Sequence, residues 1–293
     1  MERVRSAIIN SKKSKKNTRI SLFTVALFLV IAGLEAIFLS SILNEKMDNT
    51  IEVFAPLKIE EQEIEKYNWQ NINSYEIPKA KLIENKHIDK NKPMVALTFD
   101  DGPHFENTIR ILNTLSKYGA KATFFMVGEN VEKNKEIPKK VIEQGSEIGT
   151  HTLNHKDLNK LNEEEILEQI TMSSKIIEEC SGTSIKLLRP PYGNNNEIVR
   201  SVSKSQEKAI ILWNVDTEDW KSRDAEKVYK HVIENVKNCD IILMHDIYSS
   251  TADATEKIVK ELTEKGYQLV TISELFEMNS KPLNYGEKYY YCK

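Results

Sequence analysis

From Pro93 onward, short apolar runs of strand length alternate with longer segments that have helical periodicity. Strands are predicted at residues 94–99, 122–127, 147–149, 186–188, 209–213, 241–244 and 268–270. Helices are predicted at residues 107–117, 137–144 and 162–179. Repeated strand–helix units place their strands parallel in one sheet, so this alternation predicts an α/β fold. The length of 293 residues and the hydrophobic content of 40% allow one barrel-sized domain with a large core.

Two short polar runs about fifty residues apart supply metal-ligand side chains. The first is TFDDG at residues 98–102, and the second is HTLNH at residues 151–155. Together they offer one carboxylate and two imidazoles, with a second carboxylate beside them that could act as a base. Either run alone is weak evidence, because paired Asp residues often cap helices and a His pair can lie on an ordinary surface. Taken together, the two runs make a metal-assisted hydrolase the first hypothesis.

Further motifs follow in order along the chain. They are GAKATFF at 119–125, RPPYG at 189–193, DTEDW at 216–220 and LMHD at 243–246. This ordered set resembles the polysaccharide deacetylase family, the NodB-like carbohydrate esterases, with all five family motifs present over residues 92–279. The resemblance implies a distorted (β/α) barrel of about seven parallel strands. Catalytic groups in such barrels lie at the carboxyl ends of strands, which is where these motifs fall.

The resemblance assigns the metal ligands to Asp101, His151 and His155. One hard oxygen and two imidazole nitrogens suit one divalent ion, with Zn²⁺ expected first and Co²⁺ or a similar ion as the alternative. The two histidines are four residues apart, so they share a face only if the segment is helical or turns tightly.

The resemblance also assigns the proton-transfer groups. Asp100 would be the general base, and Arg189 would orient it and keep it ionised. His245 would be the general acid that protonates the leaving amine. Asp219 would pair with His245 and raise its pKa, although Asp216 in the same motif remains an alternative partner.

Three residues are expected to line the sugar site: Pro191, Tyr192 and Trp220. A backbone N–H near Tyr192 would hold the oxyanion. The family branch that acts on N-acetylmuramate typically has Asn at the second position of the Asp-Asp pair. This chain has Asp101, which favours N-acetylglucosamine units. Peptidoglycan is the expected polysaccharide, while chitin oligomers, exopolysaccharide, acetylxylan and a non-catalytic glycan-binding role remain alternatives.

The N-terminus has the pattern of a membrane anchor. Residues 20–43 are apolar apart from Ser, Thr and the single charge of Glu35, and 24 residues can cross a hydrocarbon layer of ~30 Å. Residues 1–19 carry seven Lys/Arg and one Glu, which predicts a cytoplasmic N-terminus and an extracellular catalytic domain. A cleaved signal peptide is the alternative, although no small-residue cleavage site is evident near Ser40.

The remaining segments complete the predicted organisation. Residues 44–91 form a stalk, and residues 280–293 form a C-terminal tail that is expected to be frayed, with its tyrosines as an alternative sugar platform. The first 19 residues carry a net charge of +6, which leaves −9 for the rest of the chain and argues against a nucleic-acid partner. The three cysteines form no disulfide framework, and nothing indicates an obligate protein partner.

Overall fold

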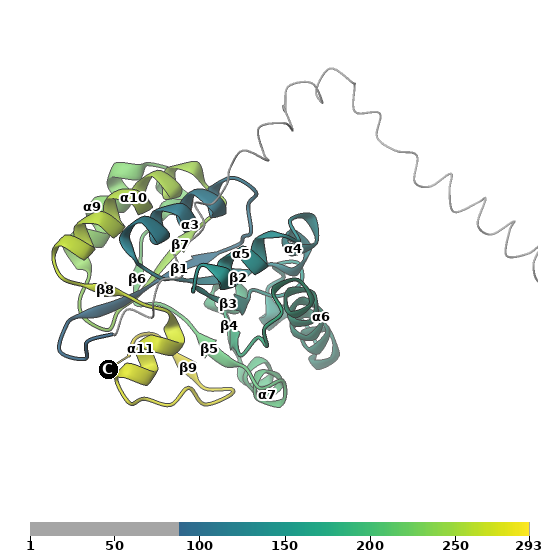
Figure 1. Cartoon of the computed structure of the whole chain (residues 1–293). Helices are drawn as coiled ribbons and strands as arrows, with labels where there is room; N and C mark the ends of the chain where they lie inside the picture. Colours follow the sequence, from purple (N-terminus) through teal and green to yellow (C-terminus); the bar gives the residue numbers. More distant parts are fainter. Residues whose placement is uncertain (1–87, 293) are drawn as a thin grey trace, which may run out of the picture. The chain divides into compact units, whose positions relative to one another are not determined.

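The computed structural model describes residues 88–292, which form the catalytic-domain part of the predicted organisation (Figure 1). The predicted segments 1–19 and 20–43, and nearly all of 44–91, lie outside the described residues. Among the residues that are described, no helix is long and apolar enough to cross a membrane.

A parallel sheet forms the centre of this domain. The strand order is β6-β7-β1-β2-β3-β4-β5-β9, and β8 pairs with the first residues of β1. The strands are β1 (Met94–Asp100), β2 (Thr123–Met126), β3 (Glu147–Thr150), β4 (Leu187–Leu188), β5 (Ala209–Ile211), β6 (Val215–Asp216), β7 (Ile241–His245), β8 (Gln268–Leu269) and β9 (Lys288–Tyr289). The predicted α/β barrel is confirmed. Within residues 88–292 the sheet has nine strands rather than about seven, because β6 and β9 are two-residue strands without apolar runs of their own.

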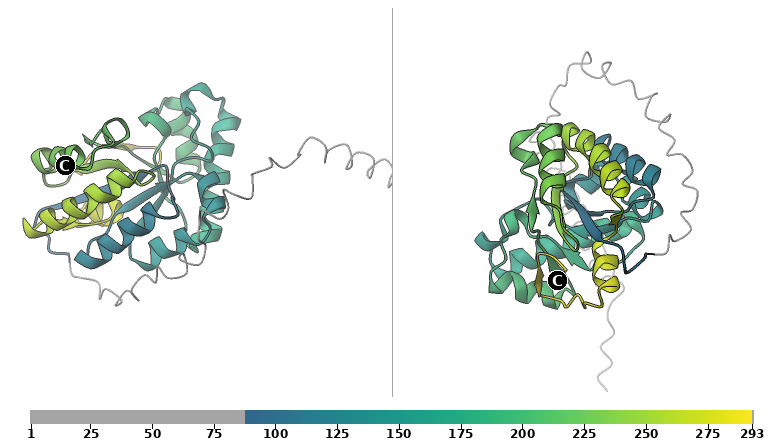
Figure 2. Two further views of the ribbon diagram at one scale, coloured as in Figure 1. Left: turned by 90° about the horizontal axis from the view of Figure 1, so that it is seen from above. Right: turned by 90° about the vertical axis from the view of Figure 1, so that its left-hand side faces the viewer.

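Helices surround the sheet, as Figures 1 and 2 show. They are α3 (Asn107–Tyr118), α4 (Gly128–Lys133), α5 (Ile137–Glu143), α6 (Glu163–Ser181), α7 (Glu197–Ser205), α8 (Asp219–Ser222), α9 (Ala225–Asn235), α10 (Ser249–Glu264) and α11 (Ile272–Met278). Helices α3, α9 and α10 pack together on one side, while α4, α5 and α7 pack around α6. The predicted helices 107–117, 137–144 and 162–179 correspond to α3, α5 and α6.

Helix α6 shows how the sequence fixes these boundaries. Asn162 accepts from the backbone N–H of Glu165, and Glu165 accepts from the backbone N–H of Asn162, which forms a capping box. Ile166, Ile170 and Ile177 recur at helical spacing and are fully buried. The helix therefore begins where its cap lies and buries the face that its periodicity predicts.

Strand register brings the catalytic motifs to one edge of the sheet. Asp100 at the end of β1 is paired with His245 at the end of β7, and Thr150 on β3 is paired with Leu188 on β4. Gly149 faces Phe125 across β2 and β3, and a Cβ at position 149 would lie 2.4 Å from the Phe125 ring. Only glycine leaves room for that ring, and the ring in turn packs against part of the site described below.

The C-terminal segment is ordered against the domain, so the expectation of a frayed tail is wrong. Strand β9 pairs in parallel with β5, and the Tyr289 ring meets the Phe276 ring edge-on with centroids 5.0 Å apart. Cys292 is buried beside the same apolar cluster. The sequence signal is weak here because two strand residues and one packed ring leave no periodic pattern.

We predict that Tyr289→Ala lowers the free energy of unfolding by about 2 kcal/mol, because a packed ring is lost from the interface with α11. Tyr290→Ala is the matched control, since its neighbouring side chain is exposed and should change stability by less than about 0.5 kcal/mol. Denaturant unfolding of both variants measures the difference. Equal stabilities would show that the C-terminal segment does not support the domain.

Candidate active site

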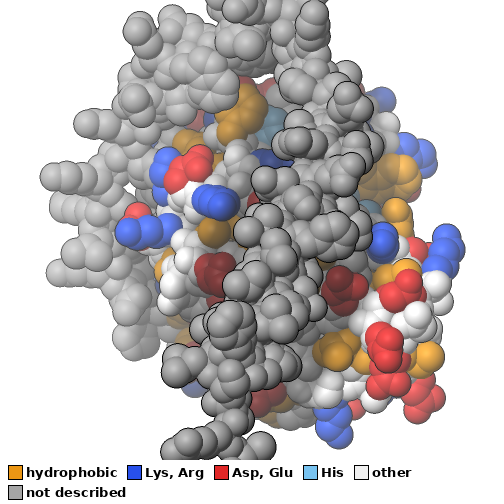
Figure 3. Space-filling view, turned by 90° about the vertical axis from the view of Figure 1, so that its right-hand side faces the viewer, with side chains coloured by type: hydrophobic (Ala, Val, Ile, Leu, Met, Phe, Trp, Pro, Cys, Tyr) orange, Lys and Arg blue, Asp and Glu red, His pale blue; other side chains and the backbone are white. Residues whose placement is uncertain are grey.

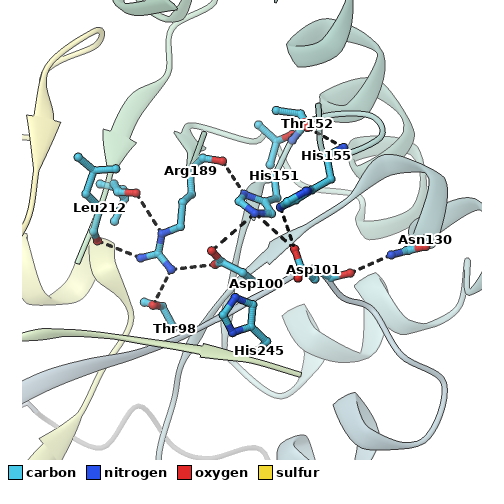
Figure 4. Close-up of polar contacts among 12 residues, drawn as sticks. Thr98, Asp100, Asp101, Asn130, His151, Thr152, His155, Arg189, Leu212 and His245 are labelled. Carbon is cyan, nitrogen blue, oxygen red and sulfur yellow. Dashed lines mark hydrogen bonds and ion pairs between the residues drawn. The ribbon is translucent and has the colours of Figure 1, made fainter. Parts of the chain in front are cut away.

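The predicted metal ligands and Asp100, Arg189 and His245 converge at the carboxyl end of the sheet (Figure 4). The predicted site residues come from the ends of β1, β3, β4, β6 and β7 and from the segments that follow these strands. Residues about 145 positions apart in the chain, such as Asp100 and His245, are neighbours across one strand pair. The barrel therefore brings together side chains that the sequence keeps far apart.

Asp101, His151 and His155 form the one group of metal-ligand side chains found in the described residues. Their donor atoms all lie within 4.8 Å of one another. Asp101 Oδ1 lies 3.5 Å from His151 Nε2 and 3.3 Å from His155 Nε2 (Figure 4). The three donor atoms are thus close enough together to share one metal ion.

A tight turn, not a helix, brings the two histidines together. Thr152 has φ of 71° and His155 has φ of 58°, both in the left-handed region. The His155 backbone N–H donates to Thr152 Oγ1 at 3.1 Å, which closes the turn. The two imidazole centroids are consequently only 4.9 Å apart.

His151 is prepared as a neutral ligand. Its Nδ1 lies 2.6 Å from the carbonyl oxygen of Arg189, so Nδ1–H donates there and Nε2 is left to face Asp101. Burial lowers the pKa of His151 to about 3. A metal ligand must be unprotonated, and the interior favours that form.

The chemistry of these atoms fits a divalent ion. Asp101 Oδ1 is buried and accepts no hydrogen bond from any donor in the described part of the chain. The Asp101 carbonyl, by contrast, accepts from Asn130 Nδ2 at 2.8 Å, which anchors the residue from its backbone. A buried carboxylate oxygen that accepts no hydrogen bond and lies close to two imidazole nitrogens is a costly arrangement unless a cation joins them.

Asp100 is held by a fully buried arginine. Arg189 Nη1 donates to Asp100 Oδ1 at 2.8 Å and to Thr98 Oγ1 at 2.7 Å. Its Nε and Nη2 donate to the carbonyl oxygens of Ile211 and Leu212 at 3.1 and 3.0 Å. The side chain of Arg189 is 0% exposed. Asp100 can therefore take one orientation, with Oδ1 on the arginine and Oδ2 toward the metal-ligand cluster.

Aromatic rings complete the support of this arginine. The guanidinium lies 4.2 Å from the centroid of the Phe125 ring and 5.6 Å from that of Trp213. Burial raises the pKa of Asp100, while the charge of Arg189 opposes this rise. The carboxyl group is thus a stronger base than an exposed aspartate, and Arg189 keeps its charged form accessible.

His245 is paired with Asp219 and not with Asp216. Its Nδ1 lies 2.7 Å from Asp219 Oδ1, and its backbone N–H donates to Asp219 Oδ2 at 2.8 Å. Asp219 is fully buried and also accepts from Thr251 Oγ1 at 2.7 Å. Asp216 instead accepts from the backbone N–H of Glu218. The geometry thus decides between the two carboxylates that the motif left open.

Asp219 controls the charge of this imidazole. Burial by itself would lower the pKa of His245, but the hydrogen bond and the negative charge of Asp219 raise it to about 9. At neutral pH the ring is therefore protonated, with Nδ1–H on Asp219 and Nε2–H available to donate.

The rim of the site carries exposed aromatic rings. Tyr192 is 66% exposed and meets the His155 ring edge-on, with centroids 4.9 Å apart. Trp220 is 47% exposed and follows Asp219 directly. Pro191 is buried under its turn, so of the three predicted sugar contacts only the two rings are presented at the surface. Tyr248, which the sequence reasoning missed, lies 5.9 Å from His245 between ring centroids.

Several supporting residues had no separate sequence signal. Thr98 and Thr251 hydrogen-bond Arg189 and Asp219, but isolated threonines near a motif are too common to single out. Arg223 stacks on Tyr248, with Cζ 3.4 Å from the ring centroid. His104, which the sequence places just after the Asp-Asp motif, accepts backbone N–H groups through Nδ1 at the start of α3.

The visible part of one face of the domain carries side chains of both charges. On the face drawn in Figure 3, the described residues show Lys/Arg and Asp/Glu side chains interspersed with hydrophobic ones. No single sign of charge dominates the part of this face that is visible.

The fold and the site together define a parallel α/β barrel with an Asp/His/His metal-ligand cluster flanked by two buried acid–base pairs. Residues 87–210 match the family described as polysaccharide deacetylase, and the chain belongs to this family. The predicted resemblance is thereby confirmed.

Two curated relatives illustrate this membership. The chain is 39% identical over 226 residues to peptidoglycan-N-acetylmuramic acid deacetylase PdaC of Bacillus subtilis, covering 76% of this chain and 48% of PdaC. It is 38% identical to peptidoglycan-N-acetylglucosamine deacetylase PgdA of Listeria monocytogenes, covering 73% of this chain and 43% of PgdA. The chain thus spans about half the length of these curated relatives.

Solved structures show the same fold. The PdaC structure matches with a TM-score of 0.64 and 41% identity, over 66% of this chain and 94% of that chain. A family 4 acetyl xylan esterase from Clostridium thermocellum, solved with a cobalt ion, matches with a TM-score of 0.64 and 31% identity, over 68% of this chain and 98% of that chain.

We predict that Asp219→Asn lowers the pKa of His245 well below about 9, since burial is then opposed only by the more distant charges of Asp100 and Asp101. NMR titration of the His245 ring in the wild type and the variant measures this change. The raised pKa in the folded state also means that the pair stabilises the fold fully below about pH 6.5. This stabilisation is lost as pH rises through about 9. A wild-type His245 that titrates near 6.5 would contradict the pairing.

Proposed function

We propose that this protein is a metal-dependent hydrolase that removes N-acetyl groups from N-acetylglucosamine units of peptidoglycan and releases acetate. The observation that carries the proposal is the placement of the Asp101, His151 and His155 cluster beside the buried base Asp100, with the protonated acid His245 on the neighbouring strand. Amide hydrolysis needs a base on one side of the carbonyl and an acid on the other, and the site offers both.

The metal would be held by the same three side chains. Zn²⁺ is our first choice, with Co²⁺ or a similar ion as the alternative, and the related acetyl xylan esterase was solved with cobalt. A bound divalent ion supplies Lewis acidity and lowers the pKa of water toward 7. His151 contributes Nε2 because its Nδ1 is occupied by the Arg189 carbonyl, and this fixes the ring orientation.

Asp100 accepts the proton of the attacking water through Oδ2, because Oδ1 is occupied by Arg189. The arginine supports this role in two ways, by fixing the orientation of the carboxylate and by opposing the effect of burial on its pKa. Burial raises the pKa of Asp100 and so strengthens it as a base, while the charge of Arg189 favours its ionised form.

His245 donates its Nε2 proton to the departing amine, which would otherwise leave as a strongly basic anion. Asp219 stabilises the imidazolium before the transfer and holds the ring through Nδ1. The negative charge that develops on the carbonyl oxygen requires a donor, which we assign to a backbone N–H near Tyr192. Tyr192 lies in a short 3-10 turn with φ of 61°, and N–H groups in a first turn lack partners within the turn.

Two choices of sugar follow from the relatives. PgdA is named for N-acetylglucosamine, which agrees with the presence of Asp101 in the first motif. PdaC is named for N-acetylmuramic acid and is similarly close, so this sugar is the second candidate. Tyr192 and Trp220 offer ring faces to either pyranose, and the choice has to be made on the products.

We further propose that residues 20–43 anchor the protein in the cell membrane with the N-terminus in the cytoplasm. The support is the sequence alone: an apolar stretch of 24 residues that follows seven Lys/Arg. This topology would place the catalytic domain on the same side of the membrane as the cell wall.

Variants of the site should separate the ligands from the proton-transfer groups. Asp100→Asn and His245→Ala should keep the metal and each lose about 10²–10⁴-fold in kcat. Asp101→Ala should lose both metal and activity. Metal content and acetate release from N-acetylglucosamine oligomers measure both properties.

In the wild type, kcat/KM should fall as pH rises through about 9, because His245 then loses its proton. A His245→Ala variant with wild-type activity would refute the assigned acid.

The substrate and the metal can be tested together: peptidoglycan is treated with the enzyme, before or after its metal is removed by a chelator, and is then digested to muropeptides. We expect glucosamine-containing muropeptides by mass spectrometry, no products after chelation, and recovery with Zn²⁺ or Co²⁺. Products that contain muramic acid would transfer the proposal to the second sugar. Release of acetate only from acetylxylan, or full activity of a demonstrably metal-free preparation, would overturn the proposal.

If residues 20–43 anchor the protein, it should sediment with membranes and resist extraction by salt and alkali. A variant that lacks residues 1–43 is the control and should be soluble. Recovery of a mature form that begins near residue 40 in the culture fluid would instead support a cleaved signal peptide.

A further inference from the structure

Asp246 is a buried carboxylate that the mechanism above does not use. It follows His245 at the end of β7 and is 0% exposed. Its Oδ2 accepts a hydrogen bond from Thr108 Oγ1. Its Oδ1 is buried and has no hydrogen-bond partner among the described residues. A carboxylate in this position is costly to the fold, so its presence needs an explanation.

The carboxylate presses against the loop that carries the metal ligand Asp101. A Cβ added at Gly102 would lie 2.3 Å from both oxygens of Asp246. The Gly102 backbone does not have positive φ, so the missing side chain reflects this close contact rather than a backbone requirement. Gly102 is joined directly to Asp101, whose own φ of 73° marks a strained turn.

A second contact reaches the same loop from its far end. Thr108 Oγ1 donates to Asp246 and accepts from the backbone N–H of His104 at 2.8 Å. The segment from Gly102 to His104 is therefore held at both ends by one carboxyl group, once through direct packing and once through a hydroxyl. Asn107 Nδ2 also donates to the carbonyl oxygen of Ile247 at 3.2 Å, so helix α3 and the end of β7 are joined beside this contact.

We propose that Asp246 is a positioning residue that fixes the Asp101 carboxylate in its metal-binding orientation through Gly102 and through Thr108 and His104. The inference rests on the proposed function in so far as Asp101 is a metal ligand there. Among the described residues, the only side chain that hydrogen-bonds the Asp246 carboxyl group is Thr108, so we assign Asp246 an action through the loop and no contact with the reacting atoms. Burial raises the pKa of Asp246 to about 7, so an amide of the same shape is a close substitute for its neutral form.

Zinc affinity of the full-length protein, measured by competition with a chromophoric chelator, tests this role without relying on activity. We expect Asp246→Ala to weaken zinc binding about 10–100-fold, the range typical of residues that hold metal ligands. Asp246→Asn should stay within about threefold of the wild type, because the amide keeps the volume and can accept from Thr108. Zinc affinity that Asp246→Ala leaves unchanged would overturn the proposal.

The chain offers a matched control at the other end of the same strand. Asp240 immediately precedes β7, is 1% exposed, and accepts from Asn214 Nδ2 and the Lys237 backbone N–H, both at 2.7 Å. Asp240→Ala should lower thermal stability as Asp246→Ala does and leave zinc affinity unchanged. An equal loss of zinc affinity in both variants would reduce Asp246 to a general stability residue and overturn the proposal.

A double-mutant cycle tests the contact itself. Gly102→Ala should weaken zinc binding because the new methyl group displaces the loop from Asp246. In the Gly102→Ala/Asp246→Ala double variant the clash is gone, so affinity should be no lower than in Asp246→Ala alone. Additive losses would contradict the contact.

Acetate release is measured in parallel. A wild type that binds zinc and releases no acetate refutes the proposed function alone. A wild type that binds no zinc overturns both the proposed function and the role of Asp246.

Discussion

The contact between Arg189 and Asp100 is the interaction on which the rest of the site depends. A guanidinium with no exposure binds the carboxylate, Thr98 Oγ1 and two carbonyl oxygens near the end of β5, and it lies against the Phe125 ring. Removing either charge would leave the other buried and unpaired, which costs several kcal/mol in typical proteins. The same residue also accepts from His151 through its carbonyl oxygen, so one arginine positions both the base and a metal ligand.

The surroundings divide two imidazoles into opposite roles. His151 has no carboxylate hydrogen-bonded to Nδ1, and burial lowers its pKa to about 3. His245 has Asp219 on Nδ1, and its pKa is about 9 despite burial. A neutral ring suits metal ligation and a protonated ring suits an acid. The hydrogen-bond partner of Nδ1 therefore determines which role each ring can take.

Much of this account could be predicted from the sequence, because apolar runs and ordered motifs are local signals. The strands that end at Asp100 and His245, and the strand that ends just before His151, lie where their apolar runs predicted them. The choice of Asp219 over Asp216 could not be made, since both carboxylates lie in one motif and only tertiary packing separates them. Strand β9 was missed because two residues carry no period. Asp246 lay within a quoted motif, but its contact with Gly102 depends on β1 and β7 being neighbours.

The central claim is that Asp101, His151 and His155 bind the metal while Asp100 remains on Arg189 as the base. Anomalous diffraction at the zinc edge, from crystals of the zinc-loaded protein, tests this most directly. We expect one zinc peak bound by those three side chains, with the Asp100–Arg189 contact unchanged. A zinc ion bound by Asp100, or a peak only at another position, would contradict the account.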